Sequence, residues 1–99
     1  MSLSERQKKH LRSLGHALKP VVTVGDAGLS EAVFEEFETQ LAHHELMKVR
    51  VRAGEREDRD LIIDELCRRG DAQLVTRIGN VALLYRRNED KPKLILPRA

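Results

Sequence analysis

The stretch that decides the fold is residues 19–30, Lys-Pro-Val-Val-Thr-Val-Gly-Asp-Ala-Gly-Leu-Ser. The β-branched run 21–24 predicts a short strand covered on both faces. Gly25 and Gly28 frame the turn that follows, and Ser30 is a favourable N-cap for a helix. Backbone N–H groups at a glycine-rich turn before a helix can hold a phosphate, although many such turns need glycine for steric reasons alone.

Upstream of this stretch, the sequence predicts an amphipathic helix over residues 5–18. Ser4 and Gln7 match a capping box at its start. Its buried stripe is expected to consist of leucines at helical spacing: Leu11, Leu14 and Leu18. The opposite face of this helix is basic and contains Lys9 and Arg12.

Downstream of Ser30, apolar residues at helical spacing predict a second helix. Its buried stripe is expected to contain Val33, Phe37 and Leu41. Its far face is acidic and carries Glu31, Glu35 and Glu38.

Residues 46–52, Leu-Met-Lys-Val-Arg-Val-Arg, alternate between apolar and basic side chains. Because successive side chains of a strand point to opposite faces, this alternation predicts a half-buried strand. Its core face would hold Met47, Val49 and Val51. Its other face would present three cations in a row: Lys48, Arg50 and Arg52.

The remaining sequence predicts a third helix and a hairpin. Residues 53–60 form a charged linker that runs into the helix, and Gly70 is a plausible C-cap. The helix should be deeply packed because its apolar arc is wide: Leu61, Ile62, Ile63, Leu66 and Cys67. Two strand-like runs, 73–78 and 81–86, flank Gly79-Asn80, which predicts a tight hairpin turn.

These elements follow the order α-β-α-β-α-β-β, which predicts an α/β fold with a small mixed four-stranded sheet and three helices. A length of 99 residues suits a single compact domain. We expect its ordered core to span about 4–88 and an extended C-terminal tail to span 89–99.

Charge is unevenly distributed, although the net charge is only +2. Residues 29–47 contain five acidic and no basic side chains, so the rest of the chain is basic. This segregation favours a local positive field and an anionic partner, whereas an ordinary solvated surface is the alternative. The chain contains no apolar run long enough to span a membrane and no signal core, and its single Cys67 fits a reducing cytoplasm.

The sequence offers no catalytic, metal or cofactor site. His43 and His44 are adjacent on a helix and chelate poorly, and Cys67 is expected to be an inert core thiol. The chain has one Tyr, two Phe and no Trp, and Tyr85 is expected in the core or at its rim. Any RNA binding should therefore depend on charge and shape rather than on base stacking.

In its order of elements and several motifs, the chain resembles the CRM-domain proteins (chloroplast RNA splicing and ribosome maturation), specifically the bacterial single-domain YhbY-like members. The motifs that carry the resemblance are Leu18-Lys19-Pro20-Val21-Val22, Gly25-x-x-Gly28-Leu29-Ser30-Glu31, His44-Glu45-Leu46-Met47-Lys48-Val49, Leu84-Tyr85-Arg86 and Leu96-Pro97-Arg98. The resemblance implies an RNA-binding module with a fold like the C-terminal domain of translation initiation factor three. It further implies association with ribosomal RNA in large-subunit precursors.

The family's G-x-x-G loop corresponds to residues 25–28, with Asp26 and Ala27 where other members often have basic or polar residues. Together, the residues and the resemblance give these candidate RNA contacts: Lys9, Arg12, Lys19, Gly25, Asp26, Ala27, Gly28, Lys48, Arg50 and Arg52. The alternative is a protein-interaction module that docks a basic ribosomal protein on the acidic face of the second helix.

Overall fold

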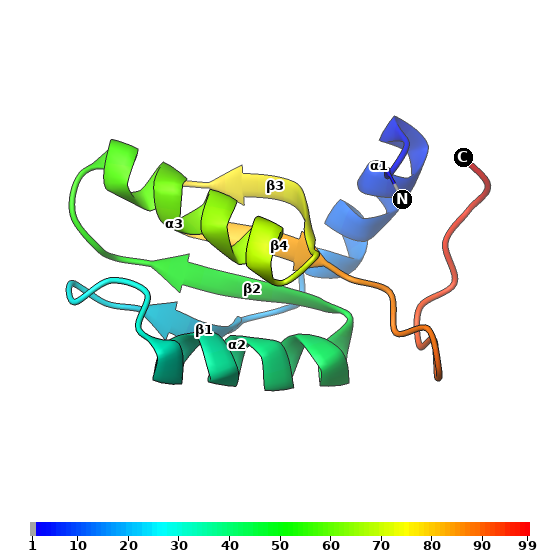
Figure 1. The fold of residues 1–99 in the computed structure, drawn as a ribbon. Helices are drawn as coiled ribbons and strands as arrows, with labels where there is room; N and C mark the ends of the chain where they lie inside the picture. The colour runs from blue at the N-terminus through cyan, green and yellow to red at the C-terminus, as the bar shows by residue number, and fades with distance from the viewer. Residues whose placement is uncertain (1) are drawn as a thin grey trace.

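Three helices and four strands follow one another along the chain as α1-β1-α2-β2-α3-β3-β4 (Figure 1). The computed structural model describes residues 2–99. The helices are α1 (Glu5–Gly15), α2 (Glu31–His44) and α3 (Arg56–Arg69). The strands are β1 (Pro20–Val24), β2 (Leu46–Val51), β3 (Gln73–Ile78) and β4 (Val81–Tyr85). The predicted order of elements is confirmed.

The four strands form one mixed sheet in the order β1-β2-β4-β3. β1 and β2 are parallel neighbours, joined through α2, whereas β4 pairs antiparallel with both β2 and β3. The predicted tight turn between β3 and β4 is confirmed, and Gly79 supplies its positive φ, at +60°. The mixed four-stranded sheet with three helices is thus confirmed.

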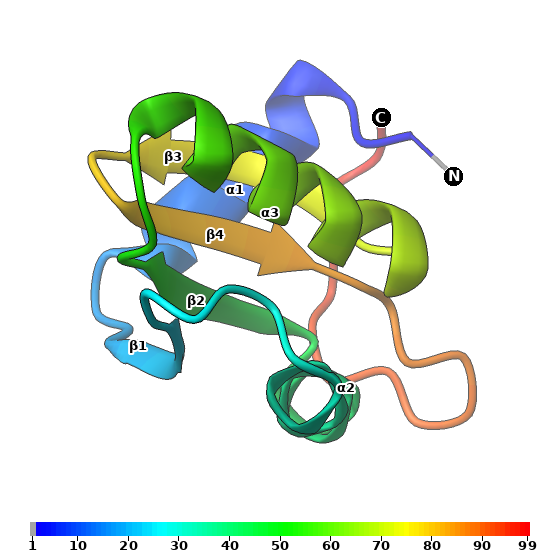
Figure 2. The ribbon, with the colours of Figure 1, turned by 60° about the vertical axis from the view of Figure 1, so that its left-hand side comes forward.

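The sheet lies between two layers of unequal extent. α2 and α3 cover one face, where they bury apolar side chains that include Phe37, Val49 and Leu66. On the other face, α1 packs against β2 and β3 and buries Leu11 beside Tyr85. Figure 2 shows α1 behind the sheet and α3 in front of it. α1 spans only part of its face, and the rest, which we call the open face, is lined by Pro20, Lys48, Arg50, Thr76, Ile78, Val81 and Leu83.

The predicted helix caps are confirmed. Ser4 and Gln7 form the reciprocal capping box of α1. The Ser30 hydroxyl accepts a hydrogen bond from the Val33 N–H at 3.2 Å and so begins α2. Gly70 is the C-cap of α3.

The predicted end of α1 and its leucine stripe are wrong in part. The helix ends at Gly15 rather than at residue 18, and Leu14 and Leu18 are exposed. Gly15 packs so closely on Leu83 that an added Cβ would lie 2.7 Å from the Leu83 Cδ2. Beyond this contact the chain turns away toward β1, so only Leu11 of the stripe is buried.

Two further predictions of burial are wrong. β1 lies at the edge of the sheet, beyond β2 and β3 on which α1 mainly packs, so one face of β1 is uncovered and Val21 is 41% exposed instead of being covered on both sides. α3 begins at Arg56, inside the segment predicted as a linker. Of its apolar arc only Ile63 and Leu66 are buried, and Leu61 is 67% exposed, because α3 rests on the sheet along a narrow stripe.

Glu45 joins α2, β4 and the C-terminal tail. Its side chain is fully buried, and its carboxylate accepts hydrogen bonds from three backbone N–H groups: Asn88 at 2.7 Å, Lys93 at 2.6 Å and Leu94 at 2.8 Å. Its own carbonyl accepts from the Arg86 N–H at 2.9 Å. A φ of +63°, which non-glycine residues rarely adopt, aims the residue inward.

The tail that Glu45 holds contains no helix or strand. Leu94 and Leu96 pack on the cluster around Leu11 and Tyr85, and the Gln7 side chain donates a hydrogen bond to the Pro97 carbonyl at 3.0 Å. The tail therefore extends the layer that α1 forms.

We expect Glu45→Ala to lower the free energy of unfolding by about 3 kcal/mol, because three backbone N–H groups that hold the tail lose a charged acceptor. Urea denaturation measures this loss, and hydrogen exchange at Lys93 and Leu94 should accelerate. Glu36→Ala, at an exposed position of α2, is the matched control and should change stability by less than about 0.5 kcal/mol. Equal stabilities of the two variants would contradict this role for Glu45.

Candidate nucleic-acid interface

The alternation predicted for residues 46–52 is confirmed. Met47, Val49 and Val51 are buried against α2 and α3. Lys48 and Arg50 lie on the open face, where Lys48 is half-buried and Arg50 is exposed. Arg52 follows the last residue of β2 and is exposed.

Arg12 of α1 extends this row of cations. It lines a shallow hollow together with Lys48, Thr76 and Leu83, and Lys48 in turn lines the neighbouring hollow with Arg50. We call Arg12, Lys48, Arg50 and Arg52 the basic track. At about 3.3 Å per residue, the part on β2 spans roughly 13 Å from Lys48 to Arg52.

None of the four cations of the basic track forms an ion pair within residues 2–99. Other arginines are paired, such as Arg69, Arg77 and Arg86. The floor of the open face is aliphatic and includes Ile78, which is 75% exposed. The face therefore combines uncompensated positive charge with an accessible surface.

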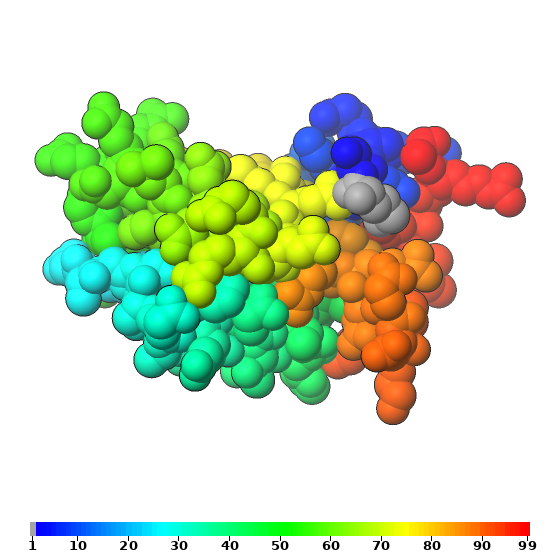
Figure 3. Space-filling view, in the orientation of Figure 1, coloured from blue at the N-terminus to red at the C-terminus, as the bar shows by residue number. Residues whose placement is uncertain are grey.

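The glycine loop, residues 25–28, lies at the carboxyl ends of β1 and β2. The Arg52 N–H donates a hydrogen bond to the Val24 carbonyl at 2.8 Å, which places the loop beside the end of the basic track. The Gly28 N–H donates to the Gly25 carbonyl at 3.0 Å and closes the turn. Figure 3 shows this loop, in cyan, next to the green segment that begins α3.

The loop is open to an approaching ligand. A Cβ added at Gly25 or Gly28 would meet no atom within 4 Å, and Asp26 and Ala27 are exposed. Gly28 has a φ of +83°, so glycine is needed there for the backbone conformation.

Lys9 and Lys19 do not gather at the loop, although they precede it closely in sequence. Lys19 stands before the first residue of β1, so the length of the strand separates it from Gly25. Lys9 is exposed on α1, which packs on β2 and β3. Of the predicted cations, the fold brings Arg12, Lys48, Arg50 and Arg52 into one row.

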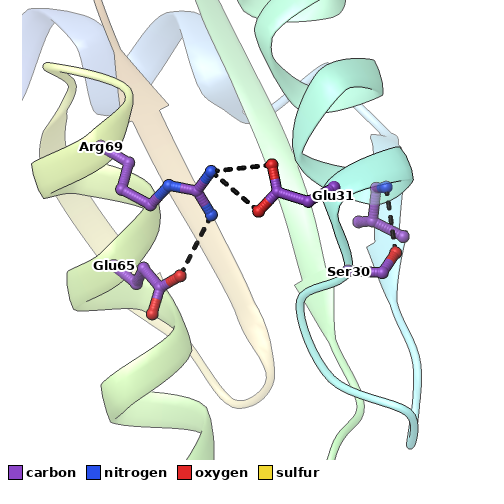
Figure 4. A network of polar contacts seen from close by, with 5 residues as sticks. Ser30, Glu31, Glu65 and Arg69 are labelled. Atoms are coloured by element: carbon purple, nitrogen blue, oxygen red, sulfur yellow. Dashed lines mark hydrogen bonds and ion pairs between the residues drawn. The ribbon is translucent and has the colours of Figure 1, made fainter.

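The acidic face of α2 is largely used inside the molecule. Arg69 of α3 contacts the Glu31 carboxylate at 3.1 Å and that of Glu65 at 3.2 Å (Figure 4). The hydrogen bond with Glu31 is the main cause that raises the pKa of Arg69. Arg86 pairs with Glu38 at 3.0 Å. Two of the three predicted docking carboxylates thus tie α2 to its neighbours.

Sequence reasoning missed a second group of arginines. Arg56, Arg59 and Arg77 meet at the hairpin turn Gly79-Asn80. Residues 56 and 59 fall in the segment predicted as a linker, for which the sequence predicted no side-chain orientation. Only the pairing of β3 with β4 brings residue 77 to them.

The structure places Tyr85 in the core, and Cys67 packs against the core at its border. Tyr85 is buried in the core, and burial first, then the nearby Glu45, raises the pKa of its hydroxyl. Cys67 is half-buried, and burial with the adjacent Asp64 raises the pKa of its thiol. Within residues 2–99 there is no cluster of His, Cys, Asp and Glu suited to a metal. No helix in that range has the length and apolarity to cross a membrane.

The model of the CRS1/YhbY (CRM) domain matches residues 3–86. This chain belongs to the CRM-domain family. The tail beyond residue 86, which Glu45 holds, lies outside the matched range. The hydrogen bonds to Glu45 dock this segment on the matched domain.

Relatives and a solved structure agree with this assignment. A Pseudomonas aeruginosa protein named a probable RNA-binding protein is 48% identical over 88 residues, covering 89% of this chain and 85% of its own. A Haemophilus influenzae protein named an RNA-binding protein is 45% identical, covering 98% and 97%. A Staphylococcus aureus structure, described as a candidate RNA-binding protein, superposes with a TM-score of 0.82 at 29% identity, covering 97% of this chain and 100% of that one.

Substitution of the two glycines of the glycine loop by alanine should affect stability differently. Gly28→Ala should lower the free energy of unfolding by about 1 kcal/mol, because alanine is strained at positive φ. Gly25→Ala should be neutral or slightly stabilising, since its surroundings are open and its φ is ordinary. Thermal unfolding of both variants measures the difference. A Gly28→Ala variant as stable as Gly25→Ala would show that the turn differs from this description.

Proposed function

We propose that this CRM domain is a non-catalytic module that binds structured RNA through the basic track and the glycine loop. The observation that carries the proposal is the basic track, in which Lys48 and Arg50 on the open face and Arg12 and Arg52 beside it have no ion-pair partner within residues 2–99. The names of the relatives, which describe RNA-binding proteins, support the same partner.

The chemistry of the track suits a phosphate backbone. Each guanidinium or ammonium group that contacts a phosphate releases condensed counterions, which drives binding at low salt. Arginine also matches the geometry of phosphate oxygens in a bidentate manner. Such contacts position a nucleic acid without reading its bases.

Shape, rather than base stacking, would supply the remaining selectivity. Phe37 and Tyr85 are buried, and Phe34 is covered by Arg69, whose guanidinium carbon lies 4.0 Å from the ring centroid. No Phe or Tyr side chain of residues 2–99 is thus free as a stacking platform. The aliphatic floor can pack against sugars and base edges of a folded RNA.

The glycine loop would add backbone contacts at the end of the track. Asp26 at its tip repels a phosphate, and the neighbouring end of β2 supplies Arg52 as a compensating cation. We therefore assign the larger share of affinity to the track and a smaller share to the loop.

The biological RNA that we propose is ribosomal RNA in a precursor of the large subunit, which places the protein in the cytoplasm. This step rests on the resemblance to the family. Ribosomal proteins would be secondary partners, because Glu31 and Glu38 of the acidic face already form ion pairs with Arg69 and Arg86.

The triple variant Lys48→Gln, Arg50→Gln, Arg52→Gln tests the track. Its RNA affinity at low salt should fall by about tenfold to a hundredfold, and the slope of log K against log salt should become about three units shallower. Fluorescence polarisation across a salt series measures both values, and circular dichroism confirms the fold.

The matched control removes three exposed cations away from the open face: Arg68→Gln, Arg87→Gln and Lys91→Gln. Equal losses in the two variants would mean that net charge alone decides affinity and would reject the track as the site. Crosslinking in cells, followed by sequencing of the attached RNA, tests the ribosomal assignment. Recovery of messenger or transfer RNA without enrichment of large-subunit RNA would contradict it.

A further inference from the structure

A basic hollow lies at the end of the sheet where the hairpin turn meets the start of α3. Its lining residues are Arg56, Arg59, Arg77, Gly79 and Asn80. Three arginines and no carboxylate line it. The hollow is separate from the basic track, because Arg77 alternates with Ile78 of the open face and contacts α3 instead.

Two of the guanidinium groups are held in place. Arg77 pairs with Asp60, and its Nε donates a hydrogen bond to the Gly79 carbonyl at 3.3 Å. Arg59 donates from Nη1 to the Gly54 carbonyl at 3.0 Å. Fixed side chains lose little further conformational freedom on binding, so the hollow is preorganised.

The donors of the hollow are not fully used. The Nε of Arg59 is buried and has no hydrogen-bond partner within residues 2–99. The Nη2 group of Arg59 likewise forms no hydrogen bond within this range, so the guanidinium of Arg59 keeps donor capacity beyond its bond to the Gly54 carbonyl. The Arg56 side chain is exposed and forms no hydrogen bond or ion pair in the same range. Asp60 offsets Arg77, which leaves the charges of Arg56 and Arg59 for an anion.

The hollow adjoins the end of the basic track. The Val51 N–H donates to the Asn80 carbonyl at 2.7 Å, and the Arg52 N–H donates to the Val24 carbonyl at 2.8 Å. The hairpin turn, the end of β2 and the glycine loop therefore form one edge of the molecule. A strand of RNA that follows the track past Arg52 arrives at this edge.

We propose that the hollow binds a backbone phosphate of the same RNA, with Arg56 and Arg59 as the principal contacts and Arg77 as a fixed third donor. The inference rests on the proposed function and extends the site around the end of the sheet. A phosphate fits the donor set because a tetrahedral oxyanion can accept from several guanidinium N–H groups at once.

The experiment compares Arg56→Gln and the double variant Arg56→Gln, Arg59→Gln with the wild-type protein. RNA affinity of the double variant should fall by about threefold to tenfold at low salt, and its salt slope should become shallower by about one to two units. Arg56→Gln alone should show about half of the slope change. The Arg56→Gln substitution removes no hydrogen bond or ion pair of the folded chain within residues 2–99. Its result therefore does not depend on the hydrogen bond between Arg59 and the Gly54 carbonyl.

The matched control is Arg68→Gln, Arg98→Gln, which removes two exposed cations elsewhere. If wild-type protein binds RNA and the hollow variants match this control in affinity and slope, the inference is overturned while the proposed function stands. If wild-type protein binds no RNA, the proposed function itself fails.

Nuclear magnetic resonance separates RNA phosphate from free phosphate. The Arg59 Nε–H and the Asn80 amide should shift when RNA is added, at concentrations where inorganic phosphate causes no comparable change. Shifts with inorganic phosphate and none with RNA would indicate a site for a free anion and would overturn the inference.

Discussion

The hydrogen bonds to the Glu45 carboxylate are the contacts on which the arrangement of the open face depends. Glu45 is the C-cap between α2 and β2, and its buried carboxylate accepts hydrogen bonds from three backbone N–H groups that follow β4. The tail then packs beside α1, so apolar side chains cover one half of that sheet face. The other half stays uncovered, and β2 presents Lys48 and Arg50 there. Glu45 thus anchors the part of the tail that covers this half of the sheet together with α1.

Local signals in the sequence are enough to predict the elements, whereas tertiary contacts decide their edges. Caps at Ser4 and Ser30 and the alternation of β2 depend on neighbouring residues, and all were predictable. The early end of α1 depends on Gly15 meeting Leu83, and the exposure of Val21 depends on β1 lying at the sheet edge. The same limit applies to the site. The row on β2 follows from periodicity, but Arg12 joins it, and Arg77 meets Arg59, only through long-range packing.

Charge pairing divides the arginines into two groups with different roles. Arg69 and Arg86 neutralise carboxylates of α2 and stabilise the packing of α2 against α3 and the end of β4. The cations of the basic track have no such partners within residues 2–99. In the hollow lined by Arg56, Arg59 and Arg77, guanidinium N–H donors of Arg56 and Arg59 also have no hydrogen-bond partner in that range. The near-neutral net charge therefore conceals a segregated surface, because Arg69 and Arg86 are paired with carboxylates of α2 whereas the cations of the basic track have no ion-pair partner within residues 2–99. The affinity of such a surface should depend strongly on salt.

Chemical-shift mapping of the labelled protein with a fragment of large-subunit ribosomal RNA tests the central claim most directly. If RNA binds the basic track, the glycine loop and the hollow, the perturbed amides should form a continuous surface from Lys48 to Arg52, across residues 25–28, and on to Gly79 and Asn80. Amides on the exposed side of α2 should not move. Perturbations confined to α2, with β2 unaffected, would contradict the account.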